Sequence, residues 1–195
     1  MTFETSQRHI LRKRIRLLRN NLTPQEQSLA ATQIHQRLCA HPKIQAAQNI
    51  SLFLSFDGEI NTRPLIETFW QQGKSVYLPV LHPFSRGHLL FLRYTPDTPM
   101  ITHPFGIQEP RLNVRSVLPV SELDVLITPL VAFDINGNRL GMGGGYYDRT
   151  LKNWQQSRNY PIGIAHDCQL VDSLPAEDWD IPLPEIVTPS HCWQW

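Results

Sequence analysis

The sequence has little of several features that mark particular classes of protein. Its 195 residues carry 18 Lys and Arg against 17 Asp and Glu, and a net charge of +1 gives no field that would collect nucleic acid or an anionic membrane. Three widely spaced cysteines, Cys39, Cys168 and Cys192, fit neither a disulfide framework nor a CxxC metal motif, so reduced thiols in a cytoplasmic protein are expected. No stretch approaches the about 20 apolar residues of a membrane span. The basic N-terminal segment also lacks the apolar core of a secretory signal. Any anion site must therefore be local.

Proline is abundant instead, at 16 of 195 residues. These prolines flank short apolar runs, as at strand ends. The runs at 50–54, 75–78, 125–128, 162–165 and 186–187 predict buried strands, and 89–94 predicts a strand in an antiparallel excursion. Helical patterns cover 7–19, a capped segment from Thr23 to about Cys39, a segment from near Pro64 to Gly73, and 146–153. The order predicts an α/β fold with α/β/α layers, a mostly parallel central sheet and a basic N-terminal helix, in one domain over 1–195.

Four of the glycines gather in the segment Gly141-Met142-Gly143-Gly144-Gly145, between a central strand and a predicted helix. Without side chains, consecutive backbone N–H groups can point at one anion, which predicts a phosphate-binding loop. The spacing matches neither the P-loop nor the dinucleotide fingerprint, and glycine richness alone fits a flexible turn better. Arg139 and Asp148 flank the loop. Asp148 could bind Mg²⁺ or could only stabilise the helix N-terminus.

The stretch Asp134-Ile135-Asn136-Gly137-Asn138-Arg139-Leu140-Gly141-Met142-Gly143-Gly144-Gly145-Tyr146-Tyr147-Asp148-Arg149 closely resembles the signature of the 5-formyltetrahydrofolate cyclo-ligase (methenyltetrahydrofolate synthetase) family. Further landmarks of that family follow in its order: Phe53-Leu54-Ser55 with Glu59, the segment 105–110, and Asp180-Ile181-Pro182-Leu183. Met142 and Gly144 depart from members that carry basic residues at those positions.

The resemblance implies a reaction in folate one-carbon metabolism. ATP and Mg²⁺ would drive the cyclisation of 5-formyltetrahydrofolate to 5,10-methenyltetrahydrofolate, with release of ADP and phosphate. The formyl oxygen would be phosphorylated and then displaced by attack of N10. Such a C–N bond-forming ligase is expected to be a cytoplasmic monomer that binds two small molecules, the folate and ATP, and neither nucleic acid nor a membrane.

The resemblance also implies roles for individual residues. The ATP-binding set is Arg8, Arg12, Arg139, Leu140, Gly141, Met142, Gly143, Gly144, Gly145, Tyr146 and Tyr147. The substrate-binding set is Leu54, Glu59, Phe105, Met142, Gly143, Gly144, Gly145 and Tyr146. Asp148 and Asp180 match the metal-linked carboxylates, and the catalytic assignment falls on Arg139, Asp148 and Glu59.

Each assignment has a structural alternative. Arg8 and Arg12 could form a solvated helix face, Glu59 could be an exposed loop residue, and Phe105 could be a core aromatic. Asp180 could cap a loop, and we interpret His166-Asp167-Cys168 as a structural turn. One alternative function is a non-catalytic regulatory protein that binds folate or a nucleotide. Another is a protein whose basic first helix binds RNA, although the balanced total charge argues against it.

Overall fold

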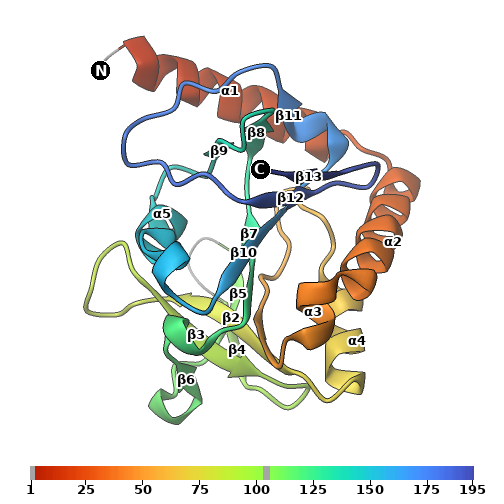
Figure 1. Cartoon of the computed structure of the whole chain (residues 1–195), viewed down its shortest axis with the longest axis vertical. Helices are drawn as coiled ribbons and strands as arrows, with labels where there is room; N and C mark the ends of the chain where they lie inside the picture. Colours follow the sequence, from red (N-terminus) through yellow and green to blue (C-terminus); the bar gives the residue numbers. More distant parts are fainter. Residues whose placement is uncertain (1–2, 103–105) are drawn as a thin grey trace.

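The computed structural model describes residues 3–102 and 106–195, except for the side chains of residues 3–6. An eight-stranded sheet forms its centre, in the order β13-β12-β10-β7-β1-β2-β3-β6 (Figure 1). The strands β12, β10, β7, β1 and β2 run parallel, whereas β3, β6 and β13 pair antiparallel at the edges. Their bounds are β1 Asn49–Ser51, β2 Ser75–Leu81, β3 Leu89–Tyr94, β6 Val117–Leu118, β7 Val125–Pro129, β10 Tyr160–Ile164, β12 Glu185–Val187 and β13 Cys192–Gln194. The predicted mostly parallel α/β sheet is confirmed.

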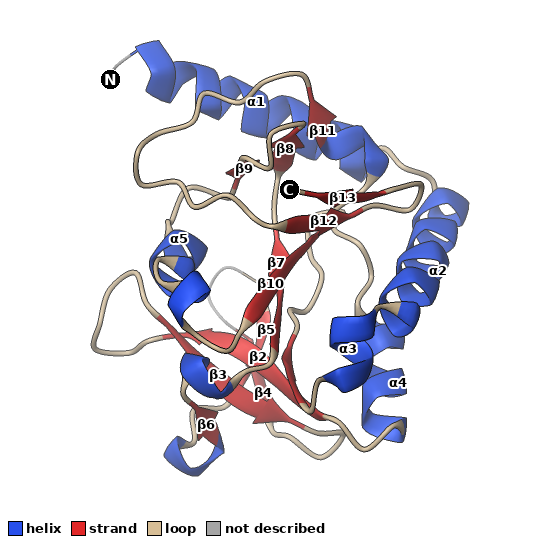
Figure 2. Cartoon of the chain, in the orientation of Figure 1, coloured by secondary structure: helices blue, strands red, loops and turns tan. Residues whose placement is uncertain are grey.

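Helices cover both faces of this sheet (Figure 2). They are α1 Phe3–Asn20, α2 Pro24–Ala40, α3 Pro42–Ala46, α4 Arg63–Gln71 and α5 Tyr146–Leu151. The apolar sides of α2, α3 and α4 pack with β1, β2, β7 and β10 into one core, and α5 packs on the other face with Phe91, Leu126 and Ile186. Among the residues that the structure describes, none of the helices has both the length and the apolar character that a bilayer crossing needs.

A second, small sheet holds α1 against the body of the protein. It contains β8 Ala132–Asp134, β9 Arg139–Leu140 and β11 Leu170–Val171, in the order β11-β8-β9. Ile15 of α1 packs on Val131, Ala132 and Leu140 in a third apolar cluster. This packing sets the long helix beside the start of the glycine-rich loop.

The remaining elements are short. β4 Met100–Thr102 and β5 Gln108–Pro110 pair antiparallel, and 3-10 helices cover η1 Val114–Ser116, η2 Val120–Glu122, η3 Trp154–Gln156 and η4 Asp167–Gln169. The segment His166-Asp167-Cys168 lies at η4, where its interpretation as a structural turn is confirmed.

Two predicted elements are shorter in the structure by two residues or more. The strand expected over 50–54 ends at Ser51, because the carbonyl of Phe53 accepts the Thr62 hydroxyl at 2.5 Å and the chain turns away from the sheet. The helix expected over 146–153 ends at Leu151 and continues as the 3-10 helix η3. The first change matters for function, because it brings Phe53, Leu54, Phe56 and Glu59 to the wall of a cavity.

Candidate active site

A cavity of about 560 Å³ opens beside the ends of β1 and β7. Five stretches of chain contribute to its wall: the turn after β1, the β2–β3 hairpin, the segment at β5, the end of β7 and the glycine-rich loop with the start of α5. The residues that line it are Phe53, Leu54, Phe56, Glu59, Leu78, Pro79, Leu81, Leu89, Ile107, Gln108, Glu109, Pro129, Leu130, Arg139, Gly141, Met142, Gly144, Gly145, Tyr146, Tyr147 and Asp148. Two of the predicted groups, the residues around Glu59 and the loop, therefore share one cavity.

The loop is held through its carbonyl groups. Nε of Arg12 donates to the carbonyl of Gly141 at 2.8 Å, and Nη1 of Arg149 donates to that of Gly144 at 2.9 Å. Within the described residues, no protein acceptor pairs with the amides of Gly141–Gly145. The loop thus has fixed carbonyls and amides that remain available for an anion.

Two left-handed residues give the loop its shape. Gly143 has a φ of 105° and Gly145, at the start of α5, a φ of 65°, both in the region that favours glycine. A side chain at either position would strain the turn. This conformational demand, together with the exposed amides, explains why the sequence uses so many glycines here.

Arg139 is a buried cation at the wall of the cavity. It is only 4% exposed, and its Nη2 donates to Oδ1 of Asp148 at 2.7 Å. Burial lowers the pKa of Arg139, and the neighbouring carboxylates, Asp148 first among them, oppose that effect. Its Nε finds no acceptor in the described part of the chain. The guanidinium is therefore a positive charge in the cavity wall that Asp148 holds in place.

Arg8 and Asp180, which lie far apart in the sequence, form an ion pair. Two parallel bonds join them, from Nη1 to Oδ2 at 2.5 Å and from Nη2 to Oδ1 at 2.9 Å, and the amide of Glu177 donates to Oδ2 at 2.9 Å. Burial works against ionisation of Asp180, but Arg8 and the Glu177 amide outweigh it and hold the pKa of this carboxyl below its usual range. The two predicted residues, one for ATP and one for metal, therefore bind each other in this structure.

Glu59 is a buried carboxyl in the same cavity. Its side chain is 7% exposed, Oε2 accepts the amide of Phe56 at 3.2 Å, and Oε1 lies 3.8 Å from Nη2 of Arg19. Burial raises the pKa of Glu59 to about 7, against the opposing attraction of Arg19. A carboxyl that exchanges its proton near neutral pH inside a cavity is typical of functional sites.

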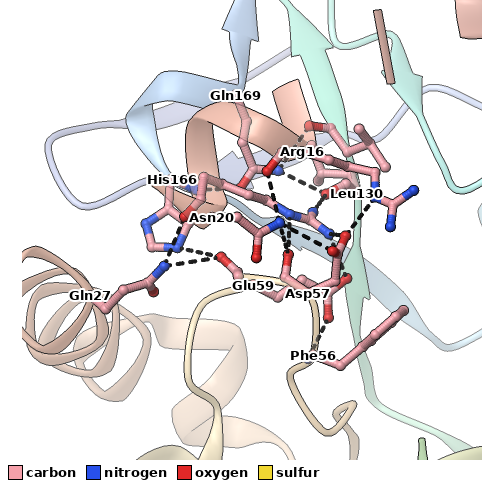
Figure 3. Close-up of polar contacts among 12 residues, drawn as sticks. Arg16, Asn20, Gln27, Phe56, Asp57, Glu59, Leu130, His166 and Gln169 are labelled. Carbon is pink, nitrogen blue, oxygen red and sulfur yellow. Dashed lines mark hydrogen bonds and ion pairs between the residues drawn. The ribbon is translucent and has the colours of Figure 1, made fainter. Parts of the chain in front are cut away.

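A polar network holds the turn that carries Glu59 (Figure 3). Arg19 is completely buried, and its Nε and Nη2 donate to the carbonyl and to Oδ2 of Asp57 at 2.7 and 2.8 Å. Nε of Arg16 donates to the same Oδ2 at 2.6 Å. His166 and Gln27 bind the carbonyl of Gly58, at 3.1 and 3.3 Å. The turn is therefore fixed from several sides.

Sequence reasoning missed Arg16, Arg19 and Asp57. A signal was present, because arginines at 8, 12, 16 and 19 follow helical spacing and share one face of α1. The stripe reaches from Asp180 past the glycine-rich loop to Asp57.

The other predicted residues fall into two groups. Leu54, Tyr146, Tyr147 and Met142 line the cavity, where burial raises the pKa of the Tyr147 hydroxyl above its usual range. Leu140 is 2% exposed in the cluster with Ile15, and its carbonyl accepts the Val131 amide at 2.7 Å, so its side chain faces the core. Phe105 lies outside the described residues.

The chain is similar to known proteins of one family. Residues 4–189 match the sequence profile of the 5-formyltetrahydrofolate cyclo-ligase family. The chain is 58% identical over 181 residues to the 5-formyltetrahydrofolate cyclo-ligase of Escherichia coli (strain K12), covering 93% of this chain and 100% of that one. It is 55% identical over 183 residues to that of Haemophilus influenzae, covering 94% and 98%. The 5,10-methenyltetrahydrofolate synthetase of Aquifex aeolicus, determined by NMR, has the same fold with a TM-score of 0.82 at 28% identity, covering 96% of this chain and 92% of that one. The protein that carries this cavity and this loop therefore belongs to the 5-formyltetrahydrofolate cyclo-ligase family and is an enzyme of that class.

Proposed function

We propose that the protein uses ATP and Mg²⁺ to cyclise 5-formyltetrahydrofolate to 5,10-methenyltetrahydrofolate, with release of ADP and phosphate. One observation carries this proposal. Gly141, Met142, Gly144 and Gly145, whose amides have no acceptor among the described residues, line the same cavity as Leu54 and Glu59, so a phosphate donor and a folate would meet in one place. Because phosphoryl transfer is catalysed mainly by positioning and charge neutralisation, this shared cavity is what the reaction requires.

The phosphate half of the site consists of the loop amides and three arginines. The amides supply dipoles, and the guanidinium of Arg139 supplies a positive charge in the cavity wall. Arg12 holds the loop from the side of α1, and Arg8 lies close enough to influence its pKa. The arginines give local positive charge in a protein whose net charge is only +1.

Asp148 has the chemistry to hold Mg²⁺. Both of its described hydrogen bonds, from Arg139 and from the amide of Ile181, go to Oδ1, which leaves Oδ2 available at the cavity. No cluster of three or more His, Cys, Asp or Glu side chains suited to a metal occurs in the described ranges, so the other ligands would be water and ATP phosphate oxygens. Asp180, bonded to Arg8, would assist through water. When bound, Mg²⁺ would neutralise charge on the phosphoryl group.

The folate half of the site is the apolar wall with Glu59. Phe53, Leu54, Leu78, Leu81 and Leu89 offer a surface for the pterin and aminobenzoyl rings. We place Glu59 beside the reacting nitrogens of the folate. A formyl amide oxygen is a poor leaving group, so it is phosphorylated first, N10 then attacks the activated carbon, and phosphate leaves.

The direct test mixes the purified protein with 5-formyltetrahydrofolate, ATP and Mg²⁺ and follows the ultraviolet absorbance of the methenyl product. We expect product and one ADP per turnover. A protein that binds folate and ATP but releases no folate-dependent ADP would be the regulatory protein instead. Glu59→Gln is expected to weaken folate binding and turnover, and unchanged values would remove Glu59 from the folate site.

A further inference from the structure

Arg19 makes its close contacts with Asp57 rather than with Glu59. Its Nη2 lies 2.8 Å from Oδ2 of Asp57 but 3.8 Å from Oε1 of Glu59, beyond hydrogen-bonding distance. Its Nε also binds the Asp57 carbonyl at 2.7 Å. Because Arg19 is completely buried, it cannot exchange these bonds for water. Arg19, the cation nearest to Glu59, therefore forms its carboxylate hydrogen bond with Asp57.

The turn is built to keep Asp57 in that position. Asp57 has a φ of 52°, the left-handed conformation that side chains rarely adopt, and Gly58 follows at 74°. A Cβ on Gly58 would lie 3.1 Å from the backbone of Arg19, so the turn and α1 are in close contact. Strained backbone of this kind persists where the surroundings fix it, and it concentrates at functional sites.

The other charged groups around Glu59 come from several elements. Arg16 of α1 binds Asp57, and Tyr147 of α5 lies close enough for Glu59 to raise the pKa of its hydroxyl. Arg139 of β9 shares the cavity wall but pairs with Asp148. His166, beside Gly58, is uncharged near neutral pH, because burial lowers its pKa to about 4. Arg19 is thus the cation that decides how readily Glu59 gives up its proton.

We propose that Asp57 is a positioning residue that draws the charge of Arg19 away from Glu59, so that Glu59 can accept the proton that N10 of the folate loses during ring closure. This inference rests on the proposed function. As the bond from N10 to the activated carbon forms, the N10–H bond breaks and its proton goes to a Glu59 oxygen. The C–O bond to the phosphoryl group then breaks, and phosphate leaves with that electron pair. A carboxylate bonded directly to Arg19 would be a weaker base for this step.

The variant Asp57→Asn tests this role without changing the shape of the turn. Asparagine tolerates the left-handed backbone, and its amide oxygen can still accept from Arg19. Loss of the Asp57 charge removes a repulsion from Glu59 and leaves the charge of Arg19 uncompensated, and both effects favour the Glu59 carboxylate. The matched control is Glu67→Gln, which keeps the length of the side chain and removes its charge. Glu67 is the partner of Arg63 in a surface ion pair of 2.7 Å.

The titration of Glu59 is measured directly by carbon-13 NMR of carboxyl-labelled glutamate, with Glu59→Gln to assign the signal. We expect the midpoint in Asp57→Asn to fall by about one pH unit and the midpoint in Glu67→Gln to stay unchanged. The acidic limb of the kcat/KM profile should move by the same amount. At one unit below the original midpoint, the active fraction then rises from about a tenth to about a half.

The possible outcomes distinguish failure of this inference from failure of the proposed function. An unchanged Glu59 midpoint in Asp57→Asn overturns the positioning role, whatever the activity. A shifted midpoint with an unmoved kcat/KM limb overturns Glu59 as the proton acceptor. If the wild type forms no methenyl product, the proposed function fails, and the NMR titration alone still decides whether Asp57 governs Glu59.

Discussion

Gly145→Ala tests whether the bare main chain of the loop binds phosphate. Gly145 has a φ of 65°, a left-handed conformation that costs a residue with a Cβ about 1–2 kcal/mol. The added Cβ would lie 3.2 Å from Nη1 of Arg149, the group that holds the Gly144 carbonyl. The loop can relieve the backbone strain and the close contact with Arg149 by changing its conformation, which redirects its amides. Each lost hydrogen bond to a charged group is worth about 1.5–3 kcal/mol, so we expect kcat/KM for ATP to fall about 10- to 150-fold.

Gly73→Ala is the matched control. Gly73 has a φ of 72°, nearly the same backbone conformation, and its Cβ would have nothing within 4 Å. It follows α4, at a distance from the residues that line the cavity. Both variants should therefore lose about 1–2 kcal/mol of unfolding free energy, with a fall in Tm of about 2–4 °C per kcal/mol. Thermal unfolding gives the loss of unfolding free energy, and ADP release at saturating folate gives kcat/KM for ATP. If Gly145→Ala melts like Gly73→Ala and keeps the wild-type kcat/KM for ATP, the loop amides do not bind phosphate.

Three further changes test the charged groups. Arg139→Lys keeps the charge but loses the planar fork, so we expect the KM for ATP to rise about tenfold in steady-state assays, and an unchanged KM would take Arg139 out of the phosphate site. Asp148→Asn should lose turnover at low Mg²⁺ and recover at high Mg²⁺, whereas an equal loss at every Mg²⁺ concentration would mean that Asp148 serves only to hold Arg139. Glu59→Gln should change the pH dependence of stability. Because the pKa of Glu59 rises from 4.5 to about 7 on folding, the native protein holds a proton there that the unfolded chain has released, and stability falls as the pH rises through this window. Denaturant titrations at pH 5 and 7.5 should show the wild type losing about 2.4 kcal/mol relative to the variant, and parallel curves would contradict a raised pKa.

The sequence predicted those parts of the fold that local patterns determine. The Thr23 hydroxyl accepts the Glu26 amide at the start of α2, and the Thr23 amide donates in return to the Glu26 carboxylate, as the capping-box pattern indicates. The apolar runs on either side of α4 became the parallel pair β1 and β2. The edge strand β13 and the two- and three-residue strands β8, β9 and β11 have no comparable local pattern. Their pairing depends on the partner that tertiary structure brings beside them.

The candidate site divides in the same way. The glycine-rich loop and its flanking Arg139 and Asp148 are contiguous, so the sequence could identify them together. Asp57 looked like an ordinary turn residue before glycine, because its partner Arg19 lies 38 positions earlier in the chain. The strand predicted over 50–54 was too long for a related reason. The same apolar character suits a buried strand and the wall of a cavity, and only the bond from Thr62 to Phe53 distinguishes the two.

The helix α1 joins the two halves of the site. Arg8 binds Asp180, Arg12 binds the Gly141 carbonyl, and Arg19 binds Asp57, so one side of one helix contacts both the glycine-rich loop and the turn of Glu59. The stripe from Arg8 to Arg19 spans about 16 Å at the helical rise per residue. Because a hydrogen-bonded helix keeps a constant rise per residue, α1 sets the distance between the glycine-rich loop and the turn of Glu59. Reactions that depend on holding a donor and an acceptor in register benefit from such a connection. We therefore expect the basic helix to contribute to catalysis through the spacing of its arginines as much as through their charge.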